Sequence, residues 1–279
     1  MVTGNVSVVS PPGLVSIVMP CCGMLEYTKL CIPSVLRWTR EPFELIFLDV
    51  GSLDGTAEYL AGLRDGLQNR VRVEVCRAAT DLDISSAARD ALQKARGEFV
   101  CLLNNDTVVT PGWLDALTGL ARVSDAFGLV GPMSNYAAPP QLVETVPYRV
   151  GSKKGGRAGE PLHSRSECST FDASAVQAFA RDFAGEHKGK WMQVERLGGF
   201  CLLVRRAVLD RVGPGLDEWT DLSLFDTDIL SAKAHQEGFT LVCCRDLFIH
   251  HFGTRTFAHG APQSAEHERE QANQWRQVV

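Results

Sequence analysis

The 279-residue sequence lacks the features of a membrane-spanning or nucleic-acid-binding protein. No apolar run approaches the ~18 residues that a membrane-spanning helix needs. The chain has 28 Lys and Arg residues against 33 Asp and Glu, a formal net charge of -5, so no basic excess is available to neutralise a nucleic-acid backbone. We therefore expect neither a transmembrane segment nor a nucleic-acid partner.

Residues 1–13, MVTGNVSVVSPPG, lack the positively charged start and the long apolar core of a signal peptide. We interpret them as a loose lead-in and expect a soluble, cytoplasmic protein. A basic patch that forms only in three dimensions would still allow peripheral attachment to a membrane, so that alternative stays open.

The nine cysteines lack the spacing of a zinc site or of a disulfide framework. Their number is odd, no two of them form a CxxC pair, and Cys21-Cys22 and Cys243-Cys244 are direct neighbours in the chain. We expect reduced cysteines that act as small core residues.

The first half of the sequence alternates between two kinds of segment. Apolar runs rich in β-branched residues predict strands at 13–20, 43–50, 71–76, 98–104 and 127–132. Amphipathic segments predict helices at 25–39, 56–65, 83–97 and from 111 onward. Asp54 or Thr56 is the expected cap of the second helix and Thr110 that of the last. The alternation predicts an α/β fold, a mostly parallel sheet with helices on both faces.

The alternation stops after Pro132. Residues 133–170 are rich in Gly, Pro, Ser and Lys, which predicts a long loop or an irregular insertion. Regular segments then return, with helices expected at 171–187 and 226–238 and strands at 198–206 and 239–253. There is no internal repeat. We expect one domain over 14–260 with halves at 14–132 and 133–260, followed by a tail at 261–279.

Polar residues end several of the predicted strands. The stretch CLLNNDTVV closes a buried strand with Asn104, Asn105 and Asp106, and Asp49 ends an earlier strand. Ligands of parallel sheets bind beyond the carboxyl ends of the strands, so these residues belong to the candidate site.

Two kinds of chemistry fit such an edge. Asp106, a histidine and ligand oxygens would suit Mg²⁺ or Mn²⁺, and a cation held so loosely suits a diphosphate substrate. A carboxylate away from the metal, Asp226, could take a proton from an attacking hydroxyl. The alternatives are that Asp226 is a plain helix N-cap, that Asp49 serves a turn, and that the His250-His251 pair is structural.

Six blocks, in order, resemble the family 2 glycosyltransferases, an inverting group with the GT-A fold. The resemblance runs from about Val15 to Phe257 and is poor over 133–195. The blocks are VSIVMPCCGMLEYTKLCIPSVL, ELIFLDVGSLDGT, AARDALQKARGEFVCLLNNDTVVTPGWLDAL, LGGFCLLVRRAVLDRVGPGLDE, DTDILSAKAHQEGF and FIHHFGTRTF.

The resemblance implies a Rossmann-like, mostly parallel central sheet with a smaller mixed region on the acceptor side. It also implies transfer of a hexosyl group from a nucleotide-sugar donor, with a UDP-sugar expected, and makes 14–132 the donor half and 133–260 the acceptor half. It implies that Asp106 and His251 ligate Mn²⁺ or Mg²⁺, with His250 the less favoured histidine, and that Asp226 is the catalytic base. It also implies a set of residues that contact the base, the ribose or the diphosphate of the donor. These are Pro20, Asp49, Asp54, Arg89, Asn104 and Asn105. The acceptor stays open among a glycan, a lipid-linked molecule, a peptide and a small molecule, as does the oligomeric state.

Several positions depart from the family pattern. Phe225 stands where the family usually has the Glu of an ED pair, and the triplet around Asp106 keeps one acid of the usual two or three. Asp90 and the CCG after the first strand also differ. These changes support a second hypothesis, a degenerate module that binds a nucleotide-sugar or a partner without turnover. A nucleotidyltransferase is disfavoured, because PCCGMLEY supplies no Gly-rich phosphate loop with a following Lys or Arg.

Overall fold

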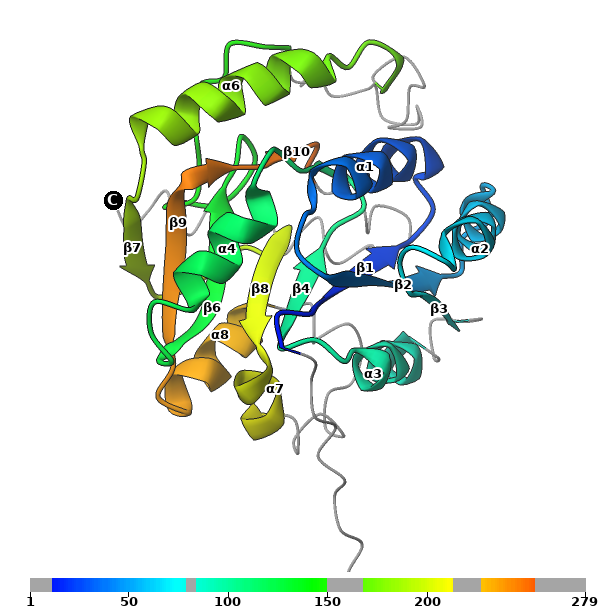
Figure 1. Cartoon of the computed structure of the whole chain (residues 1–279), viewed down its shortest axis with the longest axis horizontal. Coiled ribbons are helices and arrows are strands. Elements are labelled where there is room, and N and C mark those ends of the chain that lie inside the picture. The colour runs from blue at the N-terminus through cyan, green and yellow to red at the C-terminus, as the bar shows by residue number, and fades with distance from the viewer. Residues whose placement is uncertain (1–11, 79–83, 150–167, 213–226, 254–279) are drawn as a thin grey trace, which may run out of the picture.

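The computed structural model describes residues 12–78, 84–149, 168–212 and 227–253. An eight-stranded sheet with the order β3-β2-β1-β4-β8-β6-β9-β7 lies at the centre (Figure 1). Its strands are β1 Val15–Cys21, β2 Phe43–Val50, β3 Val73–Ala78, β4 Phe99–Leu103, β6 Phe127–Met133, β7 Trp191–Val194, β8 Cys201–Arg205 and β9 Thr240–Phe248. A separate two-stranded sheet joins β5 Thr107–Val108 to β10 His250–His251.

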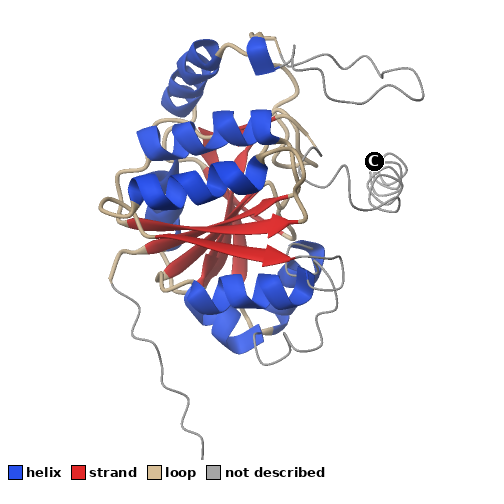
Figure 2. Cartoon of the chain, turned by 90° about the vertical axis from the view of Figure 1, so that its right-hand side faces the viewer, coloured by secondary structure: helices blue, strands red, loops and turns tan. Residues whose placement is uncertain are grey.

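Helices cover both faces of the large sheet (Figure 2). One face packs against α1 Leu25–Trp38, α2 Thr56–Leu67 and α4 Trp113–Ala121. The other packs against α3 Ile84–Lys94, α7 Arg206–Val212 and α8 Thr227–Gln236. α6 Ala173–Glu186 packs against the end of β9, where its Phe179 and Phe183 contact Phe248. This is the predicted α/β architecture. None of the helices in the described ranges is long and apolar enough to cross a membrane.

In the strands of the first half, successive side chains alternate between the two faces of the sheet, and both faces are buried under helices. In β4, Phe99, Cys101 and Leu103 pack with α1 and α4, whereas Val100 and Leu102 face the helices on the other side. β1 pairs in parallel with both β2 and β4, and β2 pairs in parallel with β3. The sequence predicted these four strands because their apolar runs are short, continuous and closed by turn residues.

Two strands of the second half run against the rest. β8 is antiparallel to both β4 and β6, and β7 is antiparallel to β9, while β6 and β9 are parallel. The strands β1, β2, β3, β4, β6 and β9 therefore all point their carboxyl ends to one edge of the sheet. The mixed directions agree with the expected mixed region on the acceptor side.

Some local predictions were wrong. Thr110 does not cap α4, because its hydroxyl donates a hydrogen bond of 2.6 Å to the carbonyl oxygen of Phe248, and Gly112 with φ of 75° precedes the helix instead. The short strands β5 and β7 were not predicted at all, since two to four residues carry too little periodicity.

Residues 134–149, the described part of the segment that follows β6, are irregular, as expected, and several of them are hydrogen-bonded to the sheet. The side chain of Gln141 donates to the carbonyl oxygen of Pro132 at 2.7 Å and accepts from the N–H of Gly198 at 2.6 Å. Ser134 forms an isolated bridge with Leu142. These contacts give residues 134–142 a defined path beside the carboxyl edge of the sheet.

Candidate functional site

Asp106 and His251 lie together at the carboxyl edge of the sheet. Asp106 follows β4 and is fully buried, and its Oδ1 lies 3.4 Å from Nε2 of His251, which is 6% exposed. The pairing of β5 with β10 brings them together, since His251 is the partner of Thr107 and the N–H of Phe252 donates to the carbonyl oxygen of Asp106 at 3.0 Å. The two side chains come from different halves of the chain.

The surroundings of His251 define which ring nitrogen carries the proton. Its Nδ1 lies 2.9 Å from the carbonyl oxygen of Tyr136. A carbonyl oxygen only accepts hydrogen bonds, so Nδ1 carries a proton and donates a hydrogen bond to Tyr136, while Nε2 is directed toward Asp106. The ring also stacks on Phe200, with centroids 5.2 Å apart and an interplanar angle of 17°.

The donor set of this pair fits a divalent cation. A carboxylate oxygen and an imidazole nitrogen are ligands that Mn²⁺ and Mg²⁺ accept, and a ligating histidine usually donates its second N–H to a carbonyl or carboxylate, as His251 does to Tyr136. Within the described ranges no three His, Cys, Asp or Glu side chains form a potential metal cluster. Further ligands would have to be substrate oxygens, water or residues elsewhere in the chain.

His250 has different surroundings from its neighbour. Its Nδ1 lies 3.1 Å from the hydroxyl of Tyr148, and its ring contacts the rings of Phe171 and Phe252. Burial lowers the pKa of His250 to about 3, with a further contribution from His251 and an opposing one from Asp106. A neutral imidazole packed among aromatic rings is a core side chain.

The two asparagines of the NND stretch hold the strand end in place. The amide of Asn105 is fully buried and donates to the carbonyl oxygen of Gly23 at 3.2 Å and to the hydroxyl of Thr28 at 2.9 Å. The backbone N–H of Asn104 donates to the carbonyl oxygen of Phe200 at 2.9 Å. Asn105 thereby ties the end of β4 to the connection between β1 and α1.

Asp49 lies in a row of residues across the carboxyl ends of three strands. Cys21, Asp49 and Arg77 are register partners in β1, β2 and β3. Asp49 is fully buried, accepts from the N–H of Ser52 at 3.2 Å and lies 3.3 Å from Nε of Arg77. Its carboxylate therefore organises the turn after β2.

The carboxylate of Asp54 connects the starts of two helices. Oδ2 accepts from the N–H of Leu25 at 2.9 Å, and Oδ1 accepts from the N–H and the hydroxyl of Thr56 at 3.2 and 2.6 Å. Partial burial would raise the pKa of Asp54, but these hydrogen bonds outweigh it and lower the pKa below its usual range. The N-cap residue of α2 is Gly55, not Asp54 or Thr56 as predicted, but the carboxylate of Asp54 still accepts hydrogen bonds from N–H groups at the starts of both α2 and α1.

The remaining predicted residues have separate positions. Pro20 is buried in β1 as the partner of Leu48, and Arg89 is an exposed residue of α3. Asp226 and Phe225 lie outside the described residues. Asp228, in the first turn of α8, lies 3.4 Å from a guanidinium nitrogen of Arg196.

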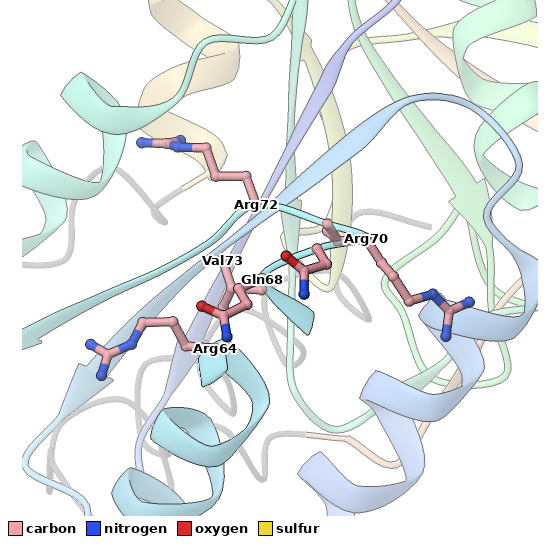
Figure 3. Close-up of a pocket in the computed structure, with 7 residues that line it drawn as sticks. Arg64, Gln68, Arg70, Arg72 and Val73 are labelled. Atoms are coloured by element: carbon pink, nitrogen blue, oxygen red, sulfur yellow. The ribbon is translucent and has the colours of Figure 1, made fainter. Parts of the chain in front are cut away.

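A surface pocket of about 370 Å³ lies at the other end of β3 from Arg77 (Figure 3). Arg64, Arg70 and Arg72 line it, but Figure 3 shows their side chains pointing in different directions. Arg72 is engaged with Glu44 at 2.6 Å and with Glu74 at 2.9 Å. None of the predicted site residues lines this pocket.

Three residues at the site were not predicted from sequence. Asn135 and Tyr136 lie in the poorly matched segment after β6 and contact His251. Phe200 immediately precedes β8, and the block LGGFCLLVRR contains it, but nothing in that block distinguishes a ring beside a site from a core residue. Phe200 lies at the carboxyl edge because β8 runs antiparallel to its neighbours, so that the start of β8 lies where the neighbouring strands end. The sequence of the block does not indicate the direction of this strand.

Comparisons with known proteins agree with this architecture. Residues 16–137 match the family model described as glycosyl transferase family 2. The O-antigen biosynthesis protein RfbC of Myxococcus xanthus is 26% identical over 255 residues, which cover 90% of this chain and 18% of that protein. The chain spans about a fifth of the length of the two curated relatives that it matches over most of its own length.

Two solved structures share the fold at low sequence identity. The mannosyltransferase PcManGT of Pyrobaculum calidifontis, in complex with GDP-Man and Mn²⁺, is 14% identical with a TM-score of 0.57, covering 88% of this chain and 59% of that one. GalNAc-T7 with UDP, GalNAc and Mn²⁺ is 16% identical with a TM-score of 0.55, covering 85% of this chain and 43% of that one. The fold is that of the GT-A glycosyltransferases.

Proposed function

We propose that this chain, which belongs to glycosyl transferase family 2 through residues 16–137, transfers a sugar from a nucleotide-diphosphate donor to an acceptor nucleophile. The observation that carries the proposal is the buried pair of Asp106 and His251, 3.4 Å apart at the carboxyl edge of a GT-A sheet. That edge is where open α/β sheets bind their ligands.

Asp106 and His251 are the residues that would hold Mn²⁺ or Mg²⁺. The bound cation would offset the negative charge that develops on the departing diphosphate. Support comes from the oxygen and nitrogen donors of the pair and from the carbonyl bond that orients the imidazole. The two solved relatives of this fold are named with Mn²⁺.

The donor nucleotide would lie over the ends of β1 and β2. Pro20 would border the base, and Asp49 and Asp54 would contact the base or ribose, with Asn104 and Arg89 reaching the ribose and diphosphate. The amide of Asn105 is engaged with Gly23 and Thr28, so we assign Asn105 to shaping the site. One solved relative is named with UDP and another with GDP-Man; we propose a UDP-sugar.

Asp226 is the proposed general base. It would take the proton of the acceptor nucleophile while that atom bonds to the anomeric carbon, and the bond from that carbon to the diphosphate oxygen would break on the opposite face. The configuration at the anomeric carbon would therefore invert. Support comes from the position of Asp226 in the family motif, directly before α8. The name of the relative RfbC adds O-antigen polysaccharide to the acceptors to be tried.

A donor screen tests the proposal. UDP-, GDP-, dTDP- and CDP-sugars, with and without Mn²⁺, are added to the wild-type chain and to Asp226→Asn, and both thermal stabilisation and sugar release or transfer are measured. We expect one donor to stabilise both proteins in a Mn²⁺-dependent way, and turnover to fall about 10²–10⁴-fold in Asp226→Asn, the usual contribution of a general base.

The outcomes separate the two hypotheses. Equal turnover in the two proteins removes Asp226 from the role of base. Stabilisation by a donor without turnover in either protein identifies a binding module, the hypothesis that Phe225 in place of the family's Glu supports.

A further inference from the structure

We propose that Asn135 and the backbone of Tyr136 are positioning elements that fix the tautomer and orientation of His251. The inference rests on the proposed function in one respect, since His251 is a metal ligand only within that function. Neither residue was among the site residues predicted from the sequence.

Asn135 binds both backbone polar groups of His251. Its Oδ1 accepts from the N–H of His251 at 3.0 Å, and its Nδ2 donates to the carbonyl oxygen of His251 at 3.0 Å. In an antiparallel pair successive peptide groups point to opposite sides, and the N–H of Phe252 points to β5, where it bonds to Asp106. The amide of Asn135 thus occupies the outer side of β10, where a third strand would otherwise pair.

Tyr136 provides the acceptor that selects the tautomer. Its carbonyl oxygen lies 2.9 Å from Nδ1 of His251, and its ring meets the His251 ring edge-on at 5.4 Å and 81°. Gly253 packs closely against the Tyr136 ring, since a Cβ added at Gly253 would lie 2.9 Å from three atoms of that ring. The φ of Gly253, +84°, also favours glycine at this position. The backbone of Tyr136 is therefore fixed by contacts of its own side chain.

The consequence concerns the lone pair of Nε2. A neutral imidazole has two tautomers, and only the one protonated at Nδ1 offers Nε2 to a cation. Asn135 fixes where the His251 backbone lies, and the Tyr136 carbonyl fixes the proton, so Nε2 faces Oδ1 of Asp106 before any ligand arrives. Partners of this kind orient metal ligands and raise their basicity.

The test observes the tautomer directly in the metal-free protein. Nitrogen-15 NMR of labelled histidine distinguishes the two tautomers and the charged ring, and the His251→Gln spectrum assigns the signal among the seven histidines. We expect a single Nδ1–H tautomer for His251 in the wild type and a mixture in Asn135→Ala. Titration with Mn²⁺ in the presence of UDP should show affinity about 10–100-fold weaker in Asn135→Ala.

Matched variants separate positioning from a general loss of structure. Tyr136→Phe keeps the ring and the backbone carbonyl, so its tautomer and Mn²⁺ affinity should equal those of the wild type. Asn69→Ala removes an exposed amide near the start of β3 and should change neither. If Asn135→Ala does not fold, Asn135→Asp, which keeps the acceptor but loses the donor, is measured in the same way.

A single, unchanged Nδ1–H tautomer in the Asn135 variant overturns the inference, whatever the Mn²⁺ titration shows. So does an Nε2–H or doubly protonated ring in the wild type at neutral pH. A wild-type chain that binds no Mn²⁺ instead overturns the metal-binding part of the proposed function, while the tautomer comparison still decides the role of Asn135.

Discussion

Under the proposed function, we call the strands β1 to β4 with their helices the donor half of the sheet and the strands β6 to β9 with theirs the acceptor half. The four strands of the donor half are parallel, whereas two strands of the acceptor half, β8 and β7, are reversed. In the donor half only strand ends reach the carboxyl edge, and they deliver Asp49 and Asp106. In the acceptor half a reversed strand also brings its lead-in to this edge, which delivers Phe200. The donor half thus supplies the two carboxylates, and the second half of the chain supplies His251 together with Asn135, Tyr136 and Phe200, which contact it.

The two halves also differ in what their tight contacts are made of. At Gly97, between α3 and β4, a Cβ would lie 2.6 Å from the carbonyl oxygen of Phe99 and 2.6 Å from the backbone nitrogen of Ser16. At Gly128 in β6, a Cβ would meet side-chain atoms of Phe239 at 2.6 Å and of Val208 at 2.8 Å. Backbone meets backbone in the first case, and backbone meets side chains in the second.

The largest expected effect tests this difference. Gly97→Ala should lower the free energy of unfolding by roughly 3 kcal/mol or more, because paired strand backbones cannot move aside, and Gly128→Ala by about 1–2 kcal/mol, because side chains can repack. Urea denaturation measures both.

The controls are glycines inside exposed helix turns. At Gly62 in α2 and Gly185 in α6 an added Cβ would have no neighbouring atom within 4 Å, so alanine there should stabilise by about 0.5–1 kcal/mol in either half. Equal losses at Gly97 and Gly128 would show that the two halves tolerate crowding alike.

The next prediction concerns the site where the halves meet. Asp106→Ala and His251→Ala should each weaken Mn²⁺-dependent binding of UDP at least about 100-fold. The double variant should bind little more weakly than either single variant, because the loss of one ligand already abolishes the shared cation site. Calorimetric titration measures the four proteins. Additive losses would mean that the residues act separately and that the halves do not share a cation.

The smallest effect lies within the donor half. Asp54→Ala should cost roughly 1 kcal/mol at pH 7, since Asp54 satisfies N–H groups at the starts of α1 and α2. The pKa of Asp54 is lowered in the folded state, so its contribution is present above the usual carboxyl pKa of about 4 and is lost as pH falls through the lower folded value.

Thermal unfolding of the wild type and Asp54→Ala between pH 7 and pH 3 measures this contribution. The difference between them should narrow toward the acid end. In the acceptor half, Asp172 caps α6 alone, through Ser174 and Ala175, and provides the matched variant that serves one helix. A difference for Asp54 that stays constant with pH would contradict a role for its charge.

The sequence allowed most of the donor half to be predicted, because its strands carry continuous apolar runs and end in turn residues. It also indicated His251 rather than His250 as the residue to consider beside Asp106, through the block FIHHFGTRTF. The contacts of Asn135 could not be predicted, because its partner is a backbone 116 residues away and no periodicity marks it. Thr110 shows the same limit, since a distant carbonyl of Phe248 outcompetes the local helix start for its hydroxyl.

The pairing of β5 with β10 also has a consequence for synthesis of the chain. Asp106 and His251 are separated by 251 − 106 = 145 positions, and β8, which lies between β4 and β6, is among the later strands to be made. At about 5–20 residues per second, a ribosome takes roughly 7–30 s to reach His251 after Asp106. For much of that interval, until β8 is made, β4 has no neighbour on its β8 side. The nascent donor half therefore has an unpaired sheet edge during this interval. Asp106 and His251 can come together only after nearly all of the described residues have been synthesised.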